Sequence, residues 1–421
     1  MKYDLVYHGP LYDFNGLRKG TIAIKNSKIV IVRNNVDQSI KGEKTISMIH
    51  ANNDVVAFPG FIDMHVHLRD YKQKYKETIE TGTSALARGG ITLACEMPNT
   101  VPPLNTVETI TKRIEELSKR SMIEILIFAG PNNDPGENSL IIDLKKVAGF
   151  KIYPFNIHLL KTLPFRKLRQ KNKLIVLHPE EPSMMSSYYT VYDANDARPL
   201  ESEIWAVRHI GDVIANHVKI HITHITSFST LLEARRYGFT SDTCPHYLLL
   251  NSKIASIKYC LAKVLPPLRG PRVNIFLKMA VQDGLIDAIT SDHAPHSIIE
   301  KIGSPHACRP GINAGELTSG LLCLVIGSNY DLLYRYMSFN PAQILGLKNY
   351  GAFVPGYVGN ITILDFSRTY WVRPSELHSL NKYSVYEGFH LPCDVVATIV
   401  RGRIIYSSQD SCEAETLWIS P

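Results

Sequence analysis

Short segments near both ends of the chain have the composition of β-strands and are separated by Gly, Asn and Ser residues typical of turns. The expected strands are Asp4–Tyr7, Thr21–Ile24, Lys28–Val32, Asn360–Leu364, Val395–Arg401 and Arg403–Tyr406. Chain termini often lie close in space. We therefore expect the two ends to form one small β-sandwich-like domain, from residues 1–57 and 347–421.

The central part of the chain alternates apolar runs with segments of helical composition, such as Thr78–Arg88 and Thr106–Lys119. The eight runs are Val56–His67, Ile91–Met97, Ile123–Phe128, Gly149–Tyr153, Leu174–His178, Lys219–His224, Phe239–Cys244 and Asp287–Asp292. Alternating strands and helices favour a parallel sheet, and eight such units favour closure into a barrel. We predict an α/β fold with a (β/α)8 TIM barrel over residues 58–346.

Composition excludes several classes of partner. The chain has 421 residues, of which 45% are hydrophobic and 20% charged, and its formal net charge is +7. It contains no dense block of Lys and Arg, so we expect no nucleic-acid partner. No apolar run is long enough to cross a bilayer, and the first residues lack the features of a signal peptide. We therefore expect no membrane association.

The number and spacing of the cysteines indicate whether the protein occupies an oxidising or a reducing compartment of the cell. The cysteines are Cys95, Cys244, Cys260, Cys308, Cys323, Cys393 and Cys412. They are odd in number, widely spaced and form no CxxC pair, which argues against a disulfide framework and against a cysteine-based zinc site. A reducing compartment is then expected, with the cytoplasm as the location.

The strongest local signal for chemistry is the pair His65 and His67 at the end of the first central run. Side chains at positions i and i+2 of a strand project from the same face, so both imidazoles would point together. That geometry suits one metal ion. For an isolated pair, two unrelated histidines would be the simpler interpretation.

The pair is not isolated, because polar residues also lie at or near the ends of later runs. These are Lys151, His178, His224 and Asp292. In a (β/α)8 barrel the carboxyl ends of the strands form one rim, where active sites lie. Four histidines and one carboxylate exceed the capacity of one tetrahedral site, so we expect two metal ions.

Lys151 has two interpretations. Addition of CO2 to its amine would give a carbamate, an anion able to bridge two metal ions, and a buried lysine with a lowered pKa is a suitable nucleophile. The alternative is a salt-bridged lysine, which the sequence alone favours.

A series of motifs, in the same order across most of the chain, resembles the dihydroorotases, which are metal-dependent cyclic amidohydrolases. The motifs are Phe58–Asp70, Lys76–Thr78, Met97–Thr100, Lys151–Pro154, Arg198–Glu201, His221–His224, Cys244–Tyr247 and Ser291–His296. Near the C-terminus, Asn340–Ala342 and Thr398–Gly402 also resemble amidohydrolase signatures.

The resemblance implies a role for each matched residue. The implied metal ligands are His65 and His67 on the first zinc ion, His178 and His224 on the second, and carboxylated Lys151 bridging both. Asp292 would bind the first zinc ion and act as the catalytic proton shuttle. The implied contacts to a substrate carboxylate are Arg69, Asn99 and His296. From the residues alone, Arg69 could instead pair with Asp70 or Glu77.

The resemblance also implies an activity. It is the reversible hydrolysis of (S)-dihydroorotate to N-carbamoyl-L-aspartate in de novo pyrimidine (UMP) biosynthesis, by a zinc-bridged hydroxide. The implied partners are the small-molecule substrate and either a second copy of the chain or an aspartate carbamoyltransferase. The alternatives are an allantoinase, a hydantoinase or dihydropyrimidinase, and a non-catalytic scaffold for a carbamoyltransferase.

Departures from the family pattern fall outside the implied metal ligands. Leu265 stands where many members have Asn in an Asn-Pro-Pro-Leu-Arg motif, which affects one expected contact to the substrate ring. Asn360 stands where an Asp that positions the backbone is expected, and Asp70–Lys74 replaces a segment that often begins Glu-Pro-Gly.

Overall fold

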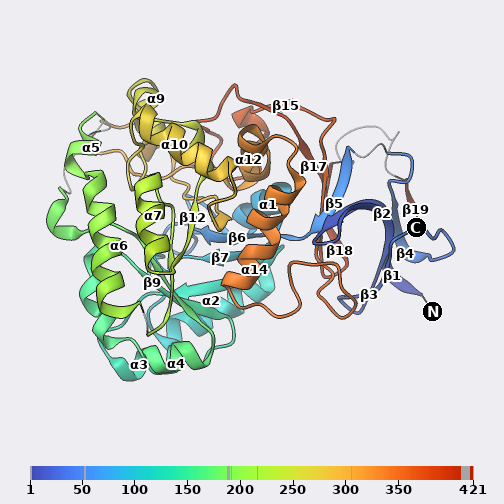
Figure 1. Ribbon diagram of the computed structural model, residues 1–421, viewed down its shortest axis with the longest axis horizontal. Helices are drawn as coiled ribbons and strands as arrows, with labels where there is room; N and C mark the ends of the chain where they lie inside the picture. The colour runs from blue at the N-terminus through green and yellow to red at the C-terminus, as the bar shows by residue number, and fades with distance from the viewer. Residues whose placement is uncertain are drawn as a thin grey trace.

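The computed structural model describes residues 2–51, 54–186, 190, 192–215, 217–304, 306–408 and 418–420 (Figure 1). One of its sheets has eight strands, all parallel, in the order in which they occur along the chain. They are β6 (Phe61–Val66), β7 (Ile91–Glu96), β8 (Glu124–Ala129), β9 (Val147–Ile152), β10 (Leu174–Leu177), β11 (Lys219–Ile222), β12 (Thr240–Thr243) and β13 (Ala288–Ile289).

The first and last of these strands meet, so the sheet closes. Val66 forms a parallel bridge with His293, just beyond β13, and the His67 N–H donates to the His293 carbonyl over 2.8 Å. The predicted (β/α)8 barrel is thereby confirmed. The interior is well packed, because β6, β7 and β9 are buried along their whole length.

Helices cover the outside of the barrel (Figure 1). The longer ones are α1 (Ile79–Arg88), α2 (Val107–Arg120), α3 (Pro135–Ile141), α4 (Phe165–Gln170), α6 (Leu200–Ile214), α7 (Phe228–Arg236), α9 (Ser252–Lys258), α10 (Pro271–Gln282) and α12 (Thr318–Ile326). Shorter ones are α5 (Ala194–Ala197), α8 (Pro245–Leu249), α11 (Ile298–Lys301), α13 (Tyr330–Tyr334) and α14 (Asn340–Ile344). In the described part of the chain, none has the length and hydropathy of a membrane-spanning helix.

The starts of α1 and α2 follow from local sequence. Thr78 and Thr106 precede these helices, and their hydroxyls accept hydrogen bonds from the N–H groups of Thr81 and Thr109. Such caps satisfy backbone donors that the first helical turn leaves free. Both helices agree with the predicted ranges.

The second sheet is built from both ends of the chain. Its strands are β1 (Tyr3–Asp13), β2 (Gly16–Lys25), β3 (Lys28–Arg33), β4 (Gly42–Ser47), β5 (Val55–Pro59), β14 (Ile361–Asp365), β17 (Asp394–Val400), β18 (Arg403–Ser407) and β19 (Trp418–Ser420). β14 lies between β5 and β17 and is antiparallel to both, which joins the two ends. A separate pair is formed by β15 (Tyr370–Trp371) and β16 (His390–Leu391). The predicted boundaries at residues 57 and 347 stay a prediction.

The expectation of one strand over Val56–His67 is wrong. β5 belongs to the sheet of the chain ends, whereas β6 is the first strand of the barrel. They are separated by Gly60, where an added Cβ would clash with the Thr92 side chain. Both strands are largely buried, so their residues form one continuous apolar run. Such a run carries no sign of the change from one sheet to the other.

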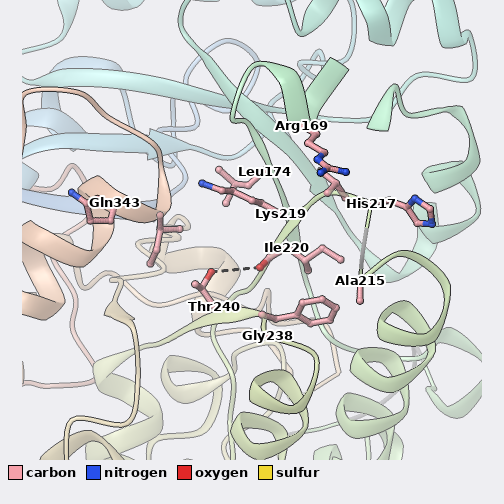
Figure 2. Close-up of a pocket in the computed structure, with 12 residues that line it drawn as sticks. Arg169, Leu174, Ala215, His217, Lys219, Ile220, Gly238, Thr240 and Gln343 are labelled. Carbon is pink, nitrogen blue, oxygen red and sulfur yellow. Dashed lines mark hydrogen bonds between the residues drawn. The ribbon is translucent and has the colours of Figure 1, made fainter. Parts of the chain in front are cut away.

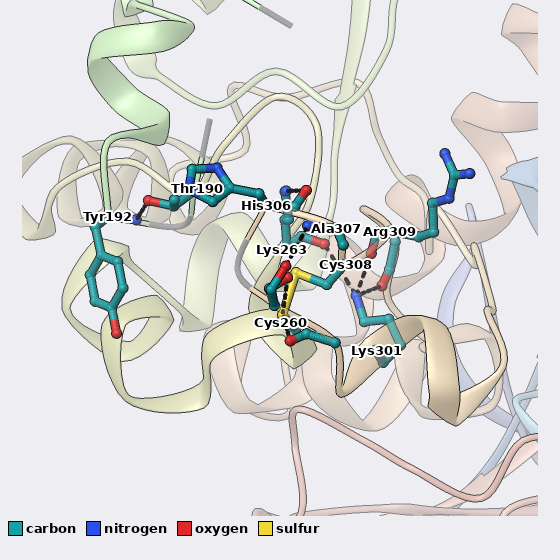
Figure 3. Close-up of a disulfide and its surroundings, with 12 residues drawn as sticks. Thr190, Tyr192, Cys260, Lys263, Lys301, His306, Ala307, Cys308 and Arg309 are labelled. Carbon is teal, nitrogen blue, oxygen red and sulfur yellow. Dashed lines mark hydrogen bonds between the residues drawn. A yellow bond between two sulfur atoms is a disulfide. The ribbon is translucent and has the colours of Figure 1, made fainter. Parts of the chain in front are cut away.

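The prediction of no disulfide framework also needs correction. Cys260 and Cys308 form a disulfide across 48 residues, with their Cα atoms 5.7 Å apart (Figure 3). The free cysteines among the described residues, all buried, are Cys95, Cys244, Cys323 and Cys393. Cys412 lies outside the described residues. The fold brings Cys260 and Cys308 together, and their spacing in the sequence does not reveal the pairing.

Loss of this disulfide should destabilise the protein. A crosslink over a long loop restricts the unfolded chain, and its removal typically costs about 2–4 kcal/mol. Cys308→Ser should therefore lower the free energy of unfolding by that amount, as measured by denaturant unfolding without reductant. Added reductant should lower the wild-type value similarly and leave the variant unchanged. An identical wild-type transition with and without reductant would contradict this prediction.

Candidate functional site

A cavity of about 420 Å³ opens at the carboxyl ends of the barrel strands. Seven of the predicted site residues line it, namely His65, His67, Arg69, Asn99, His178, His224 and Asp292. The other two contact residues of its wall: Lys151 lies over the Tyr153 ring, and His296 lies beside Arg69. The structure therefore brings all the predicted site residues to one end of the barrel.

His65, His67 and Asp292 form the tightest group. The Nε2 atoms of both histidines lie 3.3 Å from Asp292 Oδ1. One potential ligand atom from each residue lies within 4.8 Å of the others, and all three residues are buried. This donor set suits a metal ion.

Hydrogen bonds on the far side of each ring orient the two histidines. His65 Nδ1 lies 2.7 Å from Thr223 Oγ1, whose hydroxyl donates to Asp242 over 3.0 Å. His67 Nδ1 lies 2.7 Å from Asn99 Oδ1. In both cases Nδ1–H is the donor, so the lone pair is on Nε2 and faces Asp292. Such outer partners fix the tautomer of a ligating histidine.

His178 and His224 form a second group beside the first. Their rings lie 4.6 Å apart, and His224 is 5.1 Å from the His65 ring. His178 Nε2 donates to Glu180 over 2.5 Å, which leaves Nδ1 for a metal ion. Arg198 holds the same carboxylate through its Nε, over 2.9 Å. Burial favours a higher pKa for Glu180, but these bonds lower it to about 2.

Lys151 is fully buried, and no hydrogen-bond partner for its Nζ is present among the described residues. Burial lowers its pKa to about 7. The same burial, together with the charge of Lys151, lowers the pKa of His65 well below its usual value. Burial likewise lowers the pKa of His224. Neutral imidazoles are the form that binds metal ions.

Arg69 does not pair with its neighbouring acids in the described structure. Asp70 pairs with Arg120 over 2.7 Å, and Glu77 binds Ser379 and the Leu380 N–H. Arg69 itself donates from Nε to the Pro295 carbonyl over 3.1 Å. Its guanidinium is buried and lines the cavity, where it could bind an anion.

Three of these residues have a left-handed backbone. The φ angles are 55° at Arg69, 43° at His224 and 44° at Asp292. Residues other than glycine rarely adopt this conformation, and such strain concentrates at functional sites. The left-handed residues lie at the turns where the chain leaves β6, β11 and β13.

Another hollow, of about 530 Å³, lies at the opposite end of the barrel (Figure 2). It is lined by Leu174, Lys219 and Thr240, which begin β10, β11 and β12. It contains none of the predicted site residues. In this fold the amino ends of the strands serve stability rather than catalysis. The candidate site is therefore the cavity at the carboxyl ends.

Comparison with known proteins agrees with this geometry. Residues 56–152 and 207–405 match the model of the amidohydrolase family. The chain belongs to the amidohydrolase family. This amidohydrolase is 33% identical to the dihydroorotase of Saccharolobus solfataricus, over 88% of this chain and 90% of that one. It is 34% identical to the dihydroorotase of Aeropyrum pernix, over 84% of both chains.

Solved structures share the fold of this amidohydrolase. The L-hydantoinase (dihydropyrimidinase) of Arthrobacter aurescens superposes with a TM-score of 0.87 at 22% identity, over 96% of both chains. The dihydropyrimidinase of Brevibacillus agri gives a TM-score of 0.85 at 18% identity, over 96% of this chain and 95% of that one. At such identities the match supports the barrel and the sheet beside it, without deciding the substrate.

The sequence did not identify the residues that orient the histidines. Glu180 follows His178 by two positions, and Arg198 opens a motif to which the sequence gave no role. Thr223 and Asp242 support His65; Thr223 lies within the His221–His224 motif, which gave it no role, and Asp242 lies in no motif. Only Glu180 could have been predicted, because it lies two positions after His178, a predicted metal ligand.

The lowered pKa of Lys151 gives a test in metal-free protein. Only the neutral amine adds CO2, and its fraction rises as the pH increases through the pKa. At fixed dissolved CO2, the initial rate of carbamate formation should be half-maximal near pH 7, whereas ordinary lysines need a pH of about 10.4. ¹³C NMR with labelled CO2 measures this rate, and Lys151→Met should abolish the signal. A carbamate signal that persists in Lys151→Met would refute carbamate formation on Lys151.

Proposed function

We propose that this amidohydrolase is a dihydroorotase, which opens the ring of (S)-dihydroorotate to N-carbamoyl-L-aspartate and closes it again. The observation that carries the proposal is the buried guanidinium of Arg69 in the same cavity as His65, His67 and Asp292. A metal ion held by these three residues would act on the ring amide, while Arg69 would bind the carboxylate of the same substrate molecule. Similarity to proteins named dihydroorotases over most of the chain supports this substrate.

The donor groups fit two zinc ions. His65, His67 and Asp292 would hold one, His178 and His224 the other, and carboxylated Lys151 would bridge them. The support is chemical. Four imidazoles and a lysine amine are buried here, and the amine has no hydrogen-bond partner among the described residues. Buried polar groups are costly unless they bind a partner, and metal ions would be that partner. When bound, zinc ions would supply a nucleophile from water at neutral pH and polarise the ring carbonyl.

Asp292 would move the proton. Burial favours a higher pKa, but the interactions with His67 and with nearby groups such as Lys151 keep the pKa of Asp292 below its usual value. The carboxylate is therefore ionised and able to accept a proton as water adds to the ring carbonyl. It would then deliver this proton to the ring nitrogen as the C–N bond breaks, which yields the open carbamoyl amino acid.

Arg69 and Asn99 would hold the substrate carboxylate, with His296 behind Arg69. Asn99 accepts from His67 through Oδ1, so its Nδ2 is the atom left to face a ligand. Leu265 also lines the cavity and presents an apolar side chain to the ring. Hydantoin and dihydrouracil lack the carboxylate, so this arrangement favours dihydroorotate over them.

Turnover of dihydroorotate tests the proposed function, and Arg69→Ala tests its basis. Breaking one partner of a buried charge pair costs about 2–5 kcal/mol, or roughly 30-fold to several thousandfold. The variant should lose that much in kcat/KM for dihydroorotate, keep its metal content, and lose far less with hydantoin. Arg69→Lys is the matched control, which keeps the charge without the bidentate geometry. A wild-type enzyme that prefers hydantoin, dihydrouracil or allantoin would refute the assignment.

Asp292→Asn tests the proton transfer. The substitution keeps the shape but removes the proton acceptor, and such groups contribute about 10²–10⁴-fold. We expect kcat to fall by that factor in protein loaded with zinc, with metal content measured in parallel. Full activity in the metal-loaded variant would exclude Asp292 as the shuttle.

A further inference from the structure

Lys76 is a buried lysine behind the candidate site. Its side chain reaches from the segment between β6 and α1, and only 5% of the residue is exposed. Its Nζ lies 3.1 Å from His296 Nδ1 and 2.9 Å from Glu300 Oε1. Glu300 offsets its charge, but the contact with His296 places an ammonium against an imidazole and calls for an explanation.

The contact determines which nitrogen of His296 carries the proton. Burial, together with the charges of Arg69, Lys76 and Lys301, lowers the pKa of His296, so the ring is neutral and has one N–H. An ammonium can only donate, so Nδ1 must accept, and the proton is on Nε2. Nε2 then donates to the Pro310 carbonyl, 3.0 Å away.

The opposite tautomer is less favourable. It would direct an N–H at the ammonium of Lys76 and a lone pair at the Pro310 carbonyl. Its compensation would be a longer contact from Nδ1 to Glu300 Oε2, at 3.4 Å. In that tautomer Nε2 could accept only from Arg69 Nη2, at 3.3 Å. Two hydrogen bonds of 3.1 and 3.0 Å would be exchanged for two longer contacts.

The Pro310 carbonyl is itself held in place. Lys301 Nζ donates to the carbonyls of Arg309 and Gly311 over 2.9 and 2.8 Å, on either side of Pro310 (Figure 3). The disulfide anchors the same segment at Cys308. The acceptor for His296 Nε2–H therefore has a fixed position.

The tautomer has a consequence for Arg69. Its Nη2 lies 3.3 Å from His296 Nε2. Because Nε2 carries a hydrogen, it cannot accept from Arg69, and the Nη2–H groups are not used by this histidine. The N–H groups on Arg69 Nη2 are then left to meet an anion at the cavity wall, while the single N–H of His296 stays on the Pro310 carbonyl.

We propose that Lys76 is a positioning residue for the substrate carboxylate. Its ammonium keeps the His296 proton on Nε2, where it binds the Pro310 carbonyl, and the Nη2–H groups of Arg69 thereby remain hydrogen-bond donors for an anion. The identity of the anion rests on the proposed function, whereas the tautomer does not. Lys76 does not touch the substrate and acts through His296.

The tautomer can be measured directly. ¹⁵N NMR of histidine-labelled, zinc-loaded protein distinguishes the two ring nitrogens, and His296→Gln identifies the signals of His296. In wild-type protein we expect a protonated Nε2. Lys76→Met should populate the Nδ1–H form, whereas the exposed control Lys74→Met should not. A wild-type His296 protonated at Nδ1 would overturn the proposal, and this measurement needs no variant at Lys76.

Kinetics test the consequence for binding. A buried donor or acceptor left unpaired weakens binding by about 5- to 100-fold. Lys76→Met should raise KM for dihydroorotate by that factor, with kcat within a few-fold of wild type and hydantoin turnover unchanged. Lys76→Arg should recover most of the loss, because it also donates. Equal losses with both substrates would show a merely structural role and overturn the proposal. Absence of dihydroorotate turnover in wild-type protein would refute the proposed function, and the NMR result would still decide the tautomer.

Discussion

The junction between the first and last barrel strands is the constraint on which the site depends. The Asp63 carboxylate, fully buried on β6, accepts hydrogen bonds from the N–H groups of His65 and Ser291, over 3.1 and 3.2 Å. With the Val66–His293 bridge it fixes the two strand ends against each other. His65 and His67 come from one side of this junction and Asp292 from the other. A shift of one residue here would turn the histidines to the opposite face.

Burial determines the electrostatics around that junction. The cavity places imidazoles and an amine where charge is poorly solvated, so their pKa values fall. Carboxylates are also buried nearby, yet Glu180 and Asp242 are occupied on the far sides of the rings. The acids fix orientation, and the faces toward the cavity stay free for ligands. A constellation of this kind is costly to assemble and is therefore a functional signal rather than a packing solution.

The sequence predicted the parts of this structure that depend on repetition along the chain. The barrel strands appear as apolar runs, and their polar ends identified the residues that now surround one cavity. It could not predict the break at Gly60, because two adjacent strands buried in different sheets give one hydrophobic run. It also could not pair Cys260 with Cys308, or Lys76 with His296, because these contacts exist only after the barrel has closed.

The position of β14 between β5 and β17 has a consequence for synthesis on the ribosome. The Phe61 N–H binds the Thr362 hydroxyl across 301 residues, at the point where the first barrel strand begins. The amino-terminal strands thus remain without their central neighbour until nearly the whole polypeptide has emerged. Contacts of such long sequence separation slow folding and leave strand edges exposed meanwhile. A nascent chain that stalls before β14 would present an open edge at β5, which makes it a substrate for chaperones.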